Sequence, residues 1–272
     1  KKRDVPAAEF RAACREYATE WSDIQRAEFK RLGIEGDWDN PYLTMNYASQ
    51  ATVVGEFLKF VEKGLVYCGS KPVMWSPVEQ TALAEAEIEY HDHTSTTIWV
   101  RFPFQEGHGP KGFEDAQVVI WTTTPWTIPG NRAVCYGPGL SYGAYREDSV
   151  RTDMDFAPWT QPGEVLILAD ALAEQVKAAG FIAEWTRTAD VPTALLKDTK
   201  LHHPLRGFGG GYDFDVPMLS GDHVTDEAGT GFVHTAPSHG QEDYFAWLDH
   251  GYPLDAIPQT DGPDGAYTDE AP

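Results

Sequence analysis

The chain has 272 residues, of which 42% are hydrophobic and 12% aromatic, and its formal net charge is −21 at pH 7. A chain of this length can bury a core and hold one large domain or two modest ones. No apolar run approaches the roughly 20 residues that span a bilayer, so we expect no membrane partner. The acidic charge argues against a nucleic-acid backbone as the partner of the average surface, because phosphate binding needs clustered cations.

The three cysteines, Cys14, Cys68 and Cys135, lie far apart and form no CxxC pair. Neither a disulfide framework nor a thiolate zinc site is therefore predicted. Free thiols are typical of a reducing cytosol, and the first residues, Lys1–Asp4, contain no apolar segment of a secretory signal, so we expect a cytoplasmic protein. The chain does not begin with methionine and stops in a Gly/Asp/Pro-rich stretch, which suggests a piece of a longer protein.

The first quarter of the chain predicts helices. Apolar residues recur at a 3.6-residue period over 6–31, and a second helix is expected over 47–63. The residue pattern changes near Leu65–Ser76. We therefore expect residues 1–75 to form a helical segment and connector, and residues 76–272 to form a separate domain.

The remainder of the chain predicts mostly strands. Period-two alternation, or enrichment in Val, Ile, Trp and Thr, indicates strands at Ala84–Tyr90, Thr96–Phe104, Gln117–Trp121, Arg132–Tyr136, Glu164–Leu168 and Thr230–Thr235. Two further helices are expected, one over Ala171–Ala179 with Asp170 as its cap, and one over Gln241–Asp249. The fold class predicted is α+β.

A row of hydroxyls follows the predicted strand Gln117–Trp121, and it consists of Thr122, Thr123, Thr124 and Thr127. A threonine run on its own is explained by strand propensity. Pro125 stops this strand, however, and the turn that follows would expose the hydroxyls at a rim, where they can hold a water or a ribose oxygen. Both interpretations are open at this point.

Two histidines and two carboxylates gather where the last strand gives way to a helix, namely His234, His239, Glu242 and Asp243. Asp243 should fall in the first helical turn, where the macrodipole favours negative charge. In one interpretation the carboxylate caps the helix and the histidine has its hydrogen-bond partners inside the protein. In the other these residues bind a metal, although the HExxH spacing is absent. His202 and His203 are expected in a loop.

Several strings resemble the editing domain (CP1) that is inserted into the catalytic domain of isoleucyl-tRNA synthetases. The strings are Trp121–Ala133, which looks like the family's threonine-rich peptide, Gly229–Tyr244, which looks like its second editing motif, and Gly36–Thr44, Lys71–Pro77 and Thr81–Tyr90, which resemble the sequences leading into the insertion. The valyl and leucyl relatives usually carry an arginine where Thr124 stands, which favours the isoleucyl family.

The resemblance implies a β-barrel-like editing domain with flanking helices, preceded by a helical segment from the catalytic-domain side. The HIGH and KMSKS signatures of the aminoacylating site are absent from the chain. We therefore expect no cofactor in this chain, with ATP and Mg²⁺ needed only at the ligase site. Some relatives carry a CxxC pair where Ser76 and Glu79 stand, so no zinc is expected there.

The activity implied is hydrolysis of valine wrongly esterified to tRNA(Ile), with the tRNA 3′ end and the remainder of the synthetase as partners. By resemblance, Asp243 holds the α-ammonium, and the hydroxyls of Thr122, Thr123 and Thr127 orient the ester, the ribose and the attacking water. The residues expected to contact the substrate are Thr124, Trp126, Asn131, His234 and His239, with Trp126 and His234 as walls and Asn131 bracing the rim. No general base emerges, so positioning should carry the chemistry.

Two other functions remain open. A non-catalytic module that binds the tRNA 3′ end would use the same residues without hydrolysis. A small metallohydrolase would use His234, His239 and Asp243 as ligands.

Overall fold

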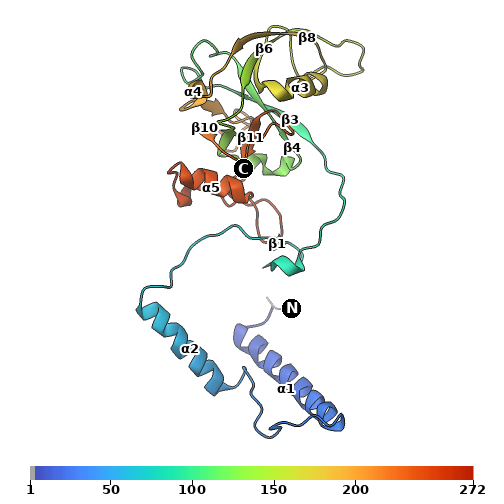
Figure 1. Cartoon of the computed structure of the whole chain (residues 1–272), viewed down its shortest axis with the longest axis vertical. Coiled ribbons are helices and arrows are strands. Elements are labelled where there is room, and N and C mark those ends of the chain that lie inside the picture. The colour runs from blue at the N-terminus through green and yellow to red at the C-terminus, as the bar shows by residue number, and fades with distance from the viewer. Residues whose placement is uncertain (1–3, 272) are drawn as a thin grey trace. The chain divides into compact units, whose positions relative to one another are not determined.

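The computed structural model describes residues 4–271 and divides into two compact units, Lys1–Ser70 and Lys71–Pro272 (Figure 1). The boundary expected from the sequence lies five residues later, between residues 75 and 76. Of residues 1–4, in which no secretory signal was expected, residues 1–3 lie outside the described residues. Within residues 4–271, no helix has the length and apolarity that a membrane span requires.

The first unit contains the two expected helices, α1 (Ala7–Arg31) and α2 (Tyr47–Glu62). No described residue of either helix is buried, and apolar side chains such as Trp21 stay exposed. Arg15 connects the two helices, because its Nη2 donates a hydrogen bond to Oε1 of Gln50 in α2 at 2.7 Å. The helical prediction is confirmed, and the apolar faces of these helices have no cover within the unit.

The second unit is built on two sheets. The five-stranded sheet has the spatial order β3 (Ile98–Pro103), β4 (Gln117–Thr122), β7 (Val165–Ala169), β6 (Tyr142–Val150) and β8 (Ile182–Asp190). Its neighbouring strands are antiparallel except β4 and β7. The four-stranded sheet has the order β11 (Phe232–Thr235), β5 (Ala133–Tyr136), β10 (Asp215–Ser220) and β9 (Lys200–His202), and in it β5 and β10 are parallel.

The main core lies between the two sheets, because alternate residues of each strand point to opposite faces. Val118 and Ile120 of β4 belong to the same buried cluster as Val134 of β5. Their neighbour Val119 faces the other way, into a cluster with the helix α3 (Ala173–Ala179). Helix α3 therefore covers the outer face of the five-stranded sheet.

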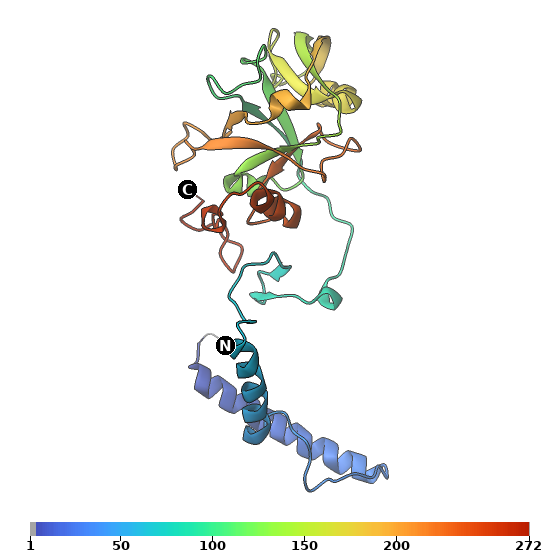
Figure 2. The same cartoon turned by 60° about the vertical axis from the view of Figure 1, so that its left-hand side comes forward.

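The outer face of the four-stranded sheet is covered by α5 (Gln241–Asp249), the last helix in Figure 1. Ala133 and Cys135 of β5 pack there with Trp247 of the helix. Figure 2 gives a second view of this arrangement of helix, sheet, sheet and helix. Helix α5 begins and ends where the sequence predicts it, and the sheet beneath it fixes where its first turn points.

Short elements complete the second unit. They are β1 (Trp75–Ser76) and β2 (Thr81–Ala82), which pair with each other, the 3₁₀ turns η1 (Glu85–Glu87), η2 (Pro125–Gly130), η3 (Asp170–Leu172) and η4 (Leu254–Ala256), and the single helical turn α4 (Thr193–Leu196).

One expected strand and the expected closure of the sheets differ from the structure. The predicted strand Ala84–Tyr90 is exposed chain with the turn η1 inside it, because no neighbouring strand offers it hydrogen bonds and alanine and glutamate favour helical turns. The two sheets stay open, so the barrel-like detail is not confirmed. The α+β class holds.

Asp170 does not cap the following helix. It starts η3, and its carboxylate instead accepts hydrogen bonds from the Arg187 guanidinium at 2.8 and 2.9 Å and from the Tyr145 hydroxyl at 2.6 Å. A carboxylate that an arginine binds through two nitrogens is more strongly satisfied than one at a helix cap.

Candidate active site

A cavity of about 380 Å³ opens where β4 and β11 end and where η2 and α5 begin. This volume lies within the range of about 300–1,000 Å³ that is typical of small-molecule sites. The cavity is lined by Trp121, Thr122, Thr124, Trp126, Thr127, Val233, His234, Ala236, His239, Gly240 and Asp243. Two segments more than a hundred residues apart in the sequence thus contribute to one site, and most of the predicted site residues meet there.

Three of the predicted threonines present hydroxyls in a chain along this cavity. The Oγ1 of Thr124 lies 3.2 Å from that of Thr122 and 3.4 Å from that of Thr127. The backbone N–H of Thr124 also donates to Oγ1 of Thr122 at 3.0 Å. Because Pro125 starts η2 directly after Thr124, the chain bends and Thr127 turns back toward the strand end.

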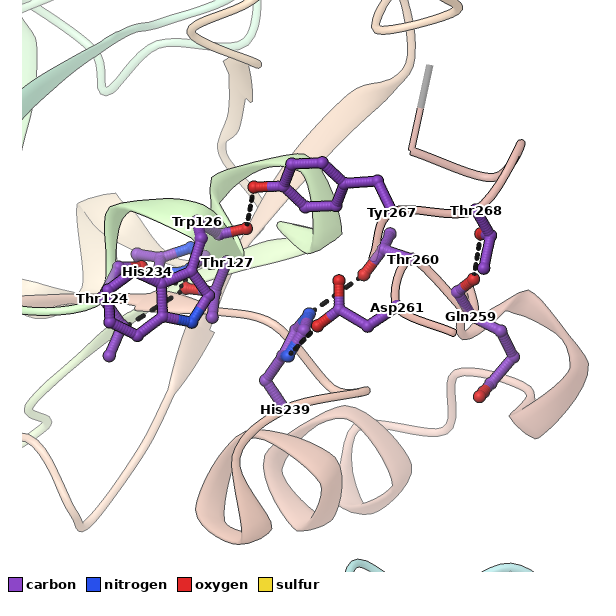
Figure 3. Close-up of polar contacts among 10 residues, drawn as sticks. All are labelled: Thr124, Trp126, Thr127, His234, His239, Gln259, Thr260, Asp261, Tyr267 and Thr268. Atoms are coloured by element: carbon purple, nitrogen blue, oxygen red, sulfur yellow. Dashed lines mark hydrogen bonds and ion pairs between the residues drawn. The ribbon is translucent and has the colours of Figure 1, made fainter. Parts of the chain in front are cut away.

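His234 lies at the end of β11, 7% exposed, with both ring nitrogens engaged. Its Nδ1 lies 2.8 Å from Nδ2 of Asn131. Its Nε2 lies 2.8 Å from Oγ1 of Thr127 (Figure 3). Nδ2 of Asn131 also donates to the carbonyl of Ala133 at 2.8 Å, which identifies it as the amide nitrogen. Nδ1 of His234 is therefore the acceptor, and its Nε2–H donates to Thr127.

The direction of the His234–Thr127 hydrogen bond determines whether Thr127 can donate or accept a hydrogen bond in the cavity. Its hydroxyl proton goes to the carbonyl of Thr124 at 2.8 Å, so that Oγ1 faces a ligand as an acceptor. Burial lowers the pKa of His234 to about 3, and the ring is neutral near pH 7. A neutral ring whose acceptor nitrogen is already occupied is not placed to take a proton from water.

Asp243 occupies the first turn of α5, as the sequence predicts. Its Oδ2 accepts the backbone N–H of Ala236 at 2.8 Å, and Gly240 leaves room for it, since a Cβ there would lie 2.8 Å from Cγ of Asp243. Burial raises the pKa of Asp243 to about 6. No ion pair to this carboxylate occurs within residues 4–271, so a cation that enters the cavity meets a carboxylate without a counterion.

His239 lines the cavity with its ring while other residues hold both of its nitrogens. Nδ1 lies 3.2 Å from Oδ2 of Asp261, and Nε2 lies 2.9 Å from Oγ1 of Thr260 (Figure 3). Burial lowers the pKa of His239, and the nearby Asp261 carboxylate opposes that shift. The ring therefore forms part of the wall of the cavity.

Two of the predicted site residues do not line the cavity. Thr123 is exposed and is not among the residues that line the cavity. Asn131 is fully buried behind His234, where it orients the imidazole through the Nδ1 contact. The expected place of Asn131 at the rim thus differs from its place in the structure.

The sequence reasoning missed several residues that shape the site. Trp121, Val233 and Gly240 line the cavity, and although all three lie inside the two strings that resemble editing motifs, no role was predicted for them. Of the two histidines expected in a loop, His202 ends β9 instead. His203 does lie in the loop that follows, but it is buried, and its Nε2 lies 3.0 Å from the carbonyl of Ile128 in η2. Tyr267 donates its hydroxyl to the carbonyl of Trp126 at 2.8 Å, from a segment that no motif marked.

A metal-binding cluster of three or more His, Cys, Asp or Glu side chains does not occur in the described part of the chain. The ring nitrogens of His234 and His239 already have hydrogen-bond partners inside the protein. At the place where some relatives carry a CxxC pair, the Ser76 hydroxyl instead donates to the Glu79 carboxylate. The geometry of these residues does not favour the metal-dependent alternative.

Comparisons with known proteins agree with the sequence resemblance. The family model described as "tRNA synthetases class I (I, L, M and V)" matches residues 1–243. The isoleucine–tRNA ligase of Rhodopseudomonas palustris is 51% identical over 269 residues, which are 97% of this chain and 26% of the relative. That of Caulobacter vibrioides is 53% identical over 267 residues, 98% of this chain and 27% of the relative. The chain thus spans about a quarter of the length of the curated relatives that it matches.

Two solved structures are also similar. The crystal structure of GlLeuRS-CP1 has a TM-score of 0.43 and 20% identity, covering 59% of this chain and 62% of that chain. The editing domain of the cytosolic leucyl-tRNA synthetase of P. falciparum has a TM-score of 0.40 and 11% identity, covering 51% of this chain and 47% of that chain.

Proposed function

This chain belongs to the class I tRNA synthetases (I, L, M and V), and from that premise we propose that its cavity is a hydrolytic editing site. The substrate is the ester of valine wrongly attached to tRNA(Ile), and the chain acts as part of an isoleucine–tRNA ligase. One observation carries the proposal. The Asp243 carboxylate, which has no counterion within residues 4–271, shares one cavity with a row of threonine hydroxyls.

Asp243 binds the α-ammonium of the misattached amino acid. An ester of an amino acid carries this positive charge a short distance from the bond to be cleaved, so a carboxylate at one end of the cavity places the carbonyl group near the other. A charge-assisted hydrogen bond of this kind contributes about 1.5–3 kcal/mol. Binding the ammonium also offsets the burial that raises the pKa of Asp243.

The hydroxyls position the reacting groups. Oγ1 of Thr127 accepts a hydrogen bond from the attacking water or from a ribose hydroxyl, since its own proton is given to Thr124. The water oxygen adds to the ester carbonyl carbon, and the bond to the ribose oxygen then breaks. The ribose oxygen leaves with the electron pair and takes up the proton that the water gives up, so that free valine and uncharged tRNA are released. Holding the reactants in place supplies the acceleration.

The walls provide the selection by size. Trp126 and the rings of His234 and His239 line the cavity together with Asp243. One methylene in a hydrophobic pocket is worth only about 1–3 kcal/mol, so a single binding step rejects valine poorly at a synthetic site. A second site that accepts valine and excludes isoleucine solves this problem by steric exclusion.

The partners proposed are the tRNA(Ile) 3′ end and the remainder of the synthetase, in the cytoplasm. The exposed apolar faces of α1 and α2 support a role in packing against further parts of a longer protein. The net charge of −21 supports local contact with the tRNA end only, with cations for the tRNA backbone coming from other parts of the enzyme. ATP and Mg²⁺ belong to the ligase site.

The test is deacylation of valyl-tRNA(Ile) by the full synthetase that contains this chain. Asp243→Ala should lower kcat/KM by about 10- to 150-fold, the equivalent of losing one charge-assisted hydrogen bond. Glu242→Ala is the matched control, because Glu242 is an exposed carboxylate beside Asp243 and does not line the cavity. Aminoacylation with isoleucine checks that each variant is folded.

The outcomes separate the alternatives. Hydrolysis at the wild-type rate by Asp243→Ala contradicts the proposed role of this carboxylate. Retention of the tRNA without hydrolysis by the wild-type enzyme favours a binding module. Loss of hydrolysis in the presence of a chelator favours a metallohydrolase.

A further inference from the structure

A small hairpin lies behind the cavity, at residues 259–268, and is called the strap from here on. Asp261 and Tyr267 face each other in an antiparallel bridge within it. The N–H of Gly262 donates to the carbonyl of Ala266 at 2.7 Å, closing the turn. The strap lies beyond residue 243, where the match to the family model ends. Its backbone bonds give its side chains fixed directions.

One contact joins the strap to η2. The hydroxyl of Tyr267 donates to the backbone carbonyl of Trp126 at 2.8 Å (Figure 3). Trp126 is half-exposed, and its indole is part of the cavity wall. This hydrogen bond therefore fixes the backbone that carries one wall.

Two further contacts join the strap to His239. Oδ2 of Asp261 lies 3.2 Å from Nδ1, and Oγ1 of the buried Thr260 lies 2.9 Å from Nε2. On another side the ring lies against Gly130, where a Cβ would come within 3.1 Å of it. The ring has little freedom, because both nitrogens and this neighbouring surface fix its position.

We propose that the strap sets the size limit of the cavity. Because Asp261 and Tyr267 lie opposite each other in one hairpin, the walls formed by His239 and Trp126 are tied to the same rigid piece. The distance between these walls decides whether a larger side chain enters. Asp261, Thr260 and Tyr267 act as positioning residues for specificity, and the inference rests on the proposed function and deepens it.

The experiment measures kcat/KM for deacylation of both valyl-tRNA(Ile) and isoleucyl-tRNA(Ile) by the full synthetase. Tyr267→Phe removes one hydroxyl, and Asp261→Ala removes the partner of Nδ1. Each should lower the ratio of valyl to isoleucyl hydrolysis about fivefold, the effect of a hydrogen bond worth ~1 kcal/mol. Asp261→Asn should stay within about twofold of wild type, since its amide oxygen still accepts a hydrogen bond from Nδ1.

Matched controls lie outside the strap contacts. Tyr90→Phe and Asp269→Ala change the same residue types at exposed positions that do not line the cavity, and both should keep the wild-type ratio. The ratio is the deciding readout, because a variant that is merely less stable loses both activities in parallel.

The results separate this inference from the proposed function. An unchanged ratio in both Tyr267→Phe and Asp261→Ala, with a wild-type enzyme that hydrolyses valyl-tRNA(Ile), overturns the role of the strap alone. A parallel loss of both rates does the same, because it assigns the strap a structural role only. A wild-type enzyme that fails to hydrolyse valyl-tRNA(Ile) overturns both.

Discussion

Nε2 of His234 lies 2.8 Å from Oγ1 of Thr127, and the imidazole is the donor. The direction follows from Asn131, whose amide nitrogen faces Nδ1 of His234 and the carbonyl of Ala133 at the same time. The distance between His234 and Thr127 is that of a catalytic histidine and the hydroxyl nucleophile it deprotonates, but the direction of the hydrogen bond is the opposite. Here the histidine holds a hydroxyl in place, and the hydroxyl oxygen faces the cavity as an acceptor.

Asn131→Ala should remove that orientation. The substitution leaves Nδ1 of His234 and the carbonyl of Ala133 without their donor in a buried place, which costs about 1–3 kcal/mol of unfolding free energy. Urea unfolding of the chain measures this loss, and deacylation by the full enzyme should fall with it. Asn46→Ala is the control, since Asn46 is exposed and its side chain makes no capping bond to α2. Equal stability of the two variants would contradict the account.

Deacylation should depend on pH through Asp243. Burial raises the pKa of Asp243 to about 6, and only the ionised carboxylate binds an ammonium group. The kcat/KM for valyl-tRNA(Ile) should therefore level off near pH 7 and fall about tenfold per pH unit well below pH 6. Asp243→Asn should show a low rate without this inflection. A wild-type profile that is flat between pH 5 and 7 would remove Asp243 from ammonium binding.

Gly240→Ala should disturb Asp243 without straining the backbone. The φ of Gly240 is −102°, which alanine adopts freely, but the new Cβ would lie 2.8 Å from Cγ of Asp243. The carboxylate must move, and we expect KM for the valyl ester to rise about tenfold with little change in stability. Gly139→Ala is the control, because its Cβ would meet no atom within 4 Å. An unchanged KM in Gly240→Ala would show that the position of Asp243 is not critical.

Stability of the second unit should depend on pH through Glu147, which lies in β6 and is 1% exposed. Burial raises its pKa from 4.5 to about 7, so the folded state binds the proton more tightly than the unfolded chain does. The stabilisation is full below about pH 4.5 and is lost as pH rises toward 7, by about 1–3 kcal/mol. Glu147→Gln should lose less stability than wild type between pH 5 and 8, measured by urea unfolding.

The control for Glu147 is Glu184→Gln, at an exposed position of β8. This variant should follow the wild-type dependence on pH. If Glu147→Gln also follows it, the carboxyl is not the group responsible.

Elements with a clear apolar period and a stop signal were predictable from the sequence. Helix α5 and strand β4 match their predicted positions within one residue. In both, the spacing of the apolar residues and the residues that end the element indicate the same bounds. Strands β6 and β8 were missed, since charged residues on their exposed faces interrupt the apolar pattern. The predicted strand Ala84–Tyr90 failed for the opposite reason, as alternation alone does not form a strand without a partner.

The candidate site was predictable as two motifs but not as a cavity. The sequence placed Thr127 and Asp243 at element ends, and the fold brings those ends together. Asn131 lies in a motif, but its contact with Nδ1 of His234 was not predicted, and Asp261, which contacts His239, lies in no motif. Such contacts depend on tertiary packing, so a single sequence carries no local signal for them.

The most direct test of the editing site is a crystal structure with a non-hydrolysable valyl-adenosine, in which an amide replaces the ester. The account predicts the valyl group in the cavity, with its ammonium about 2.7–3.2 Å from the Asp243 carboxylate and its amide N–H or a ribose hydroxyl donating to Oγ1 of Thr127. A valyl group that binds outside the cavity, or an ammonium that other residues hold, would contradict it.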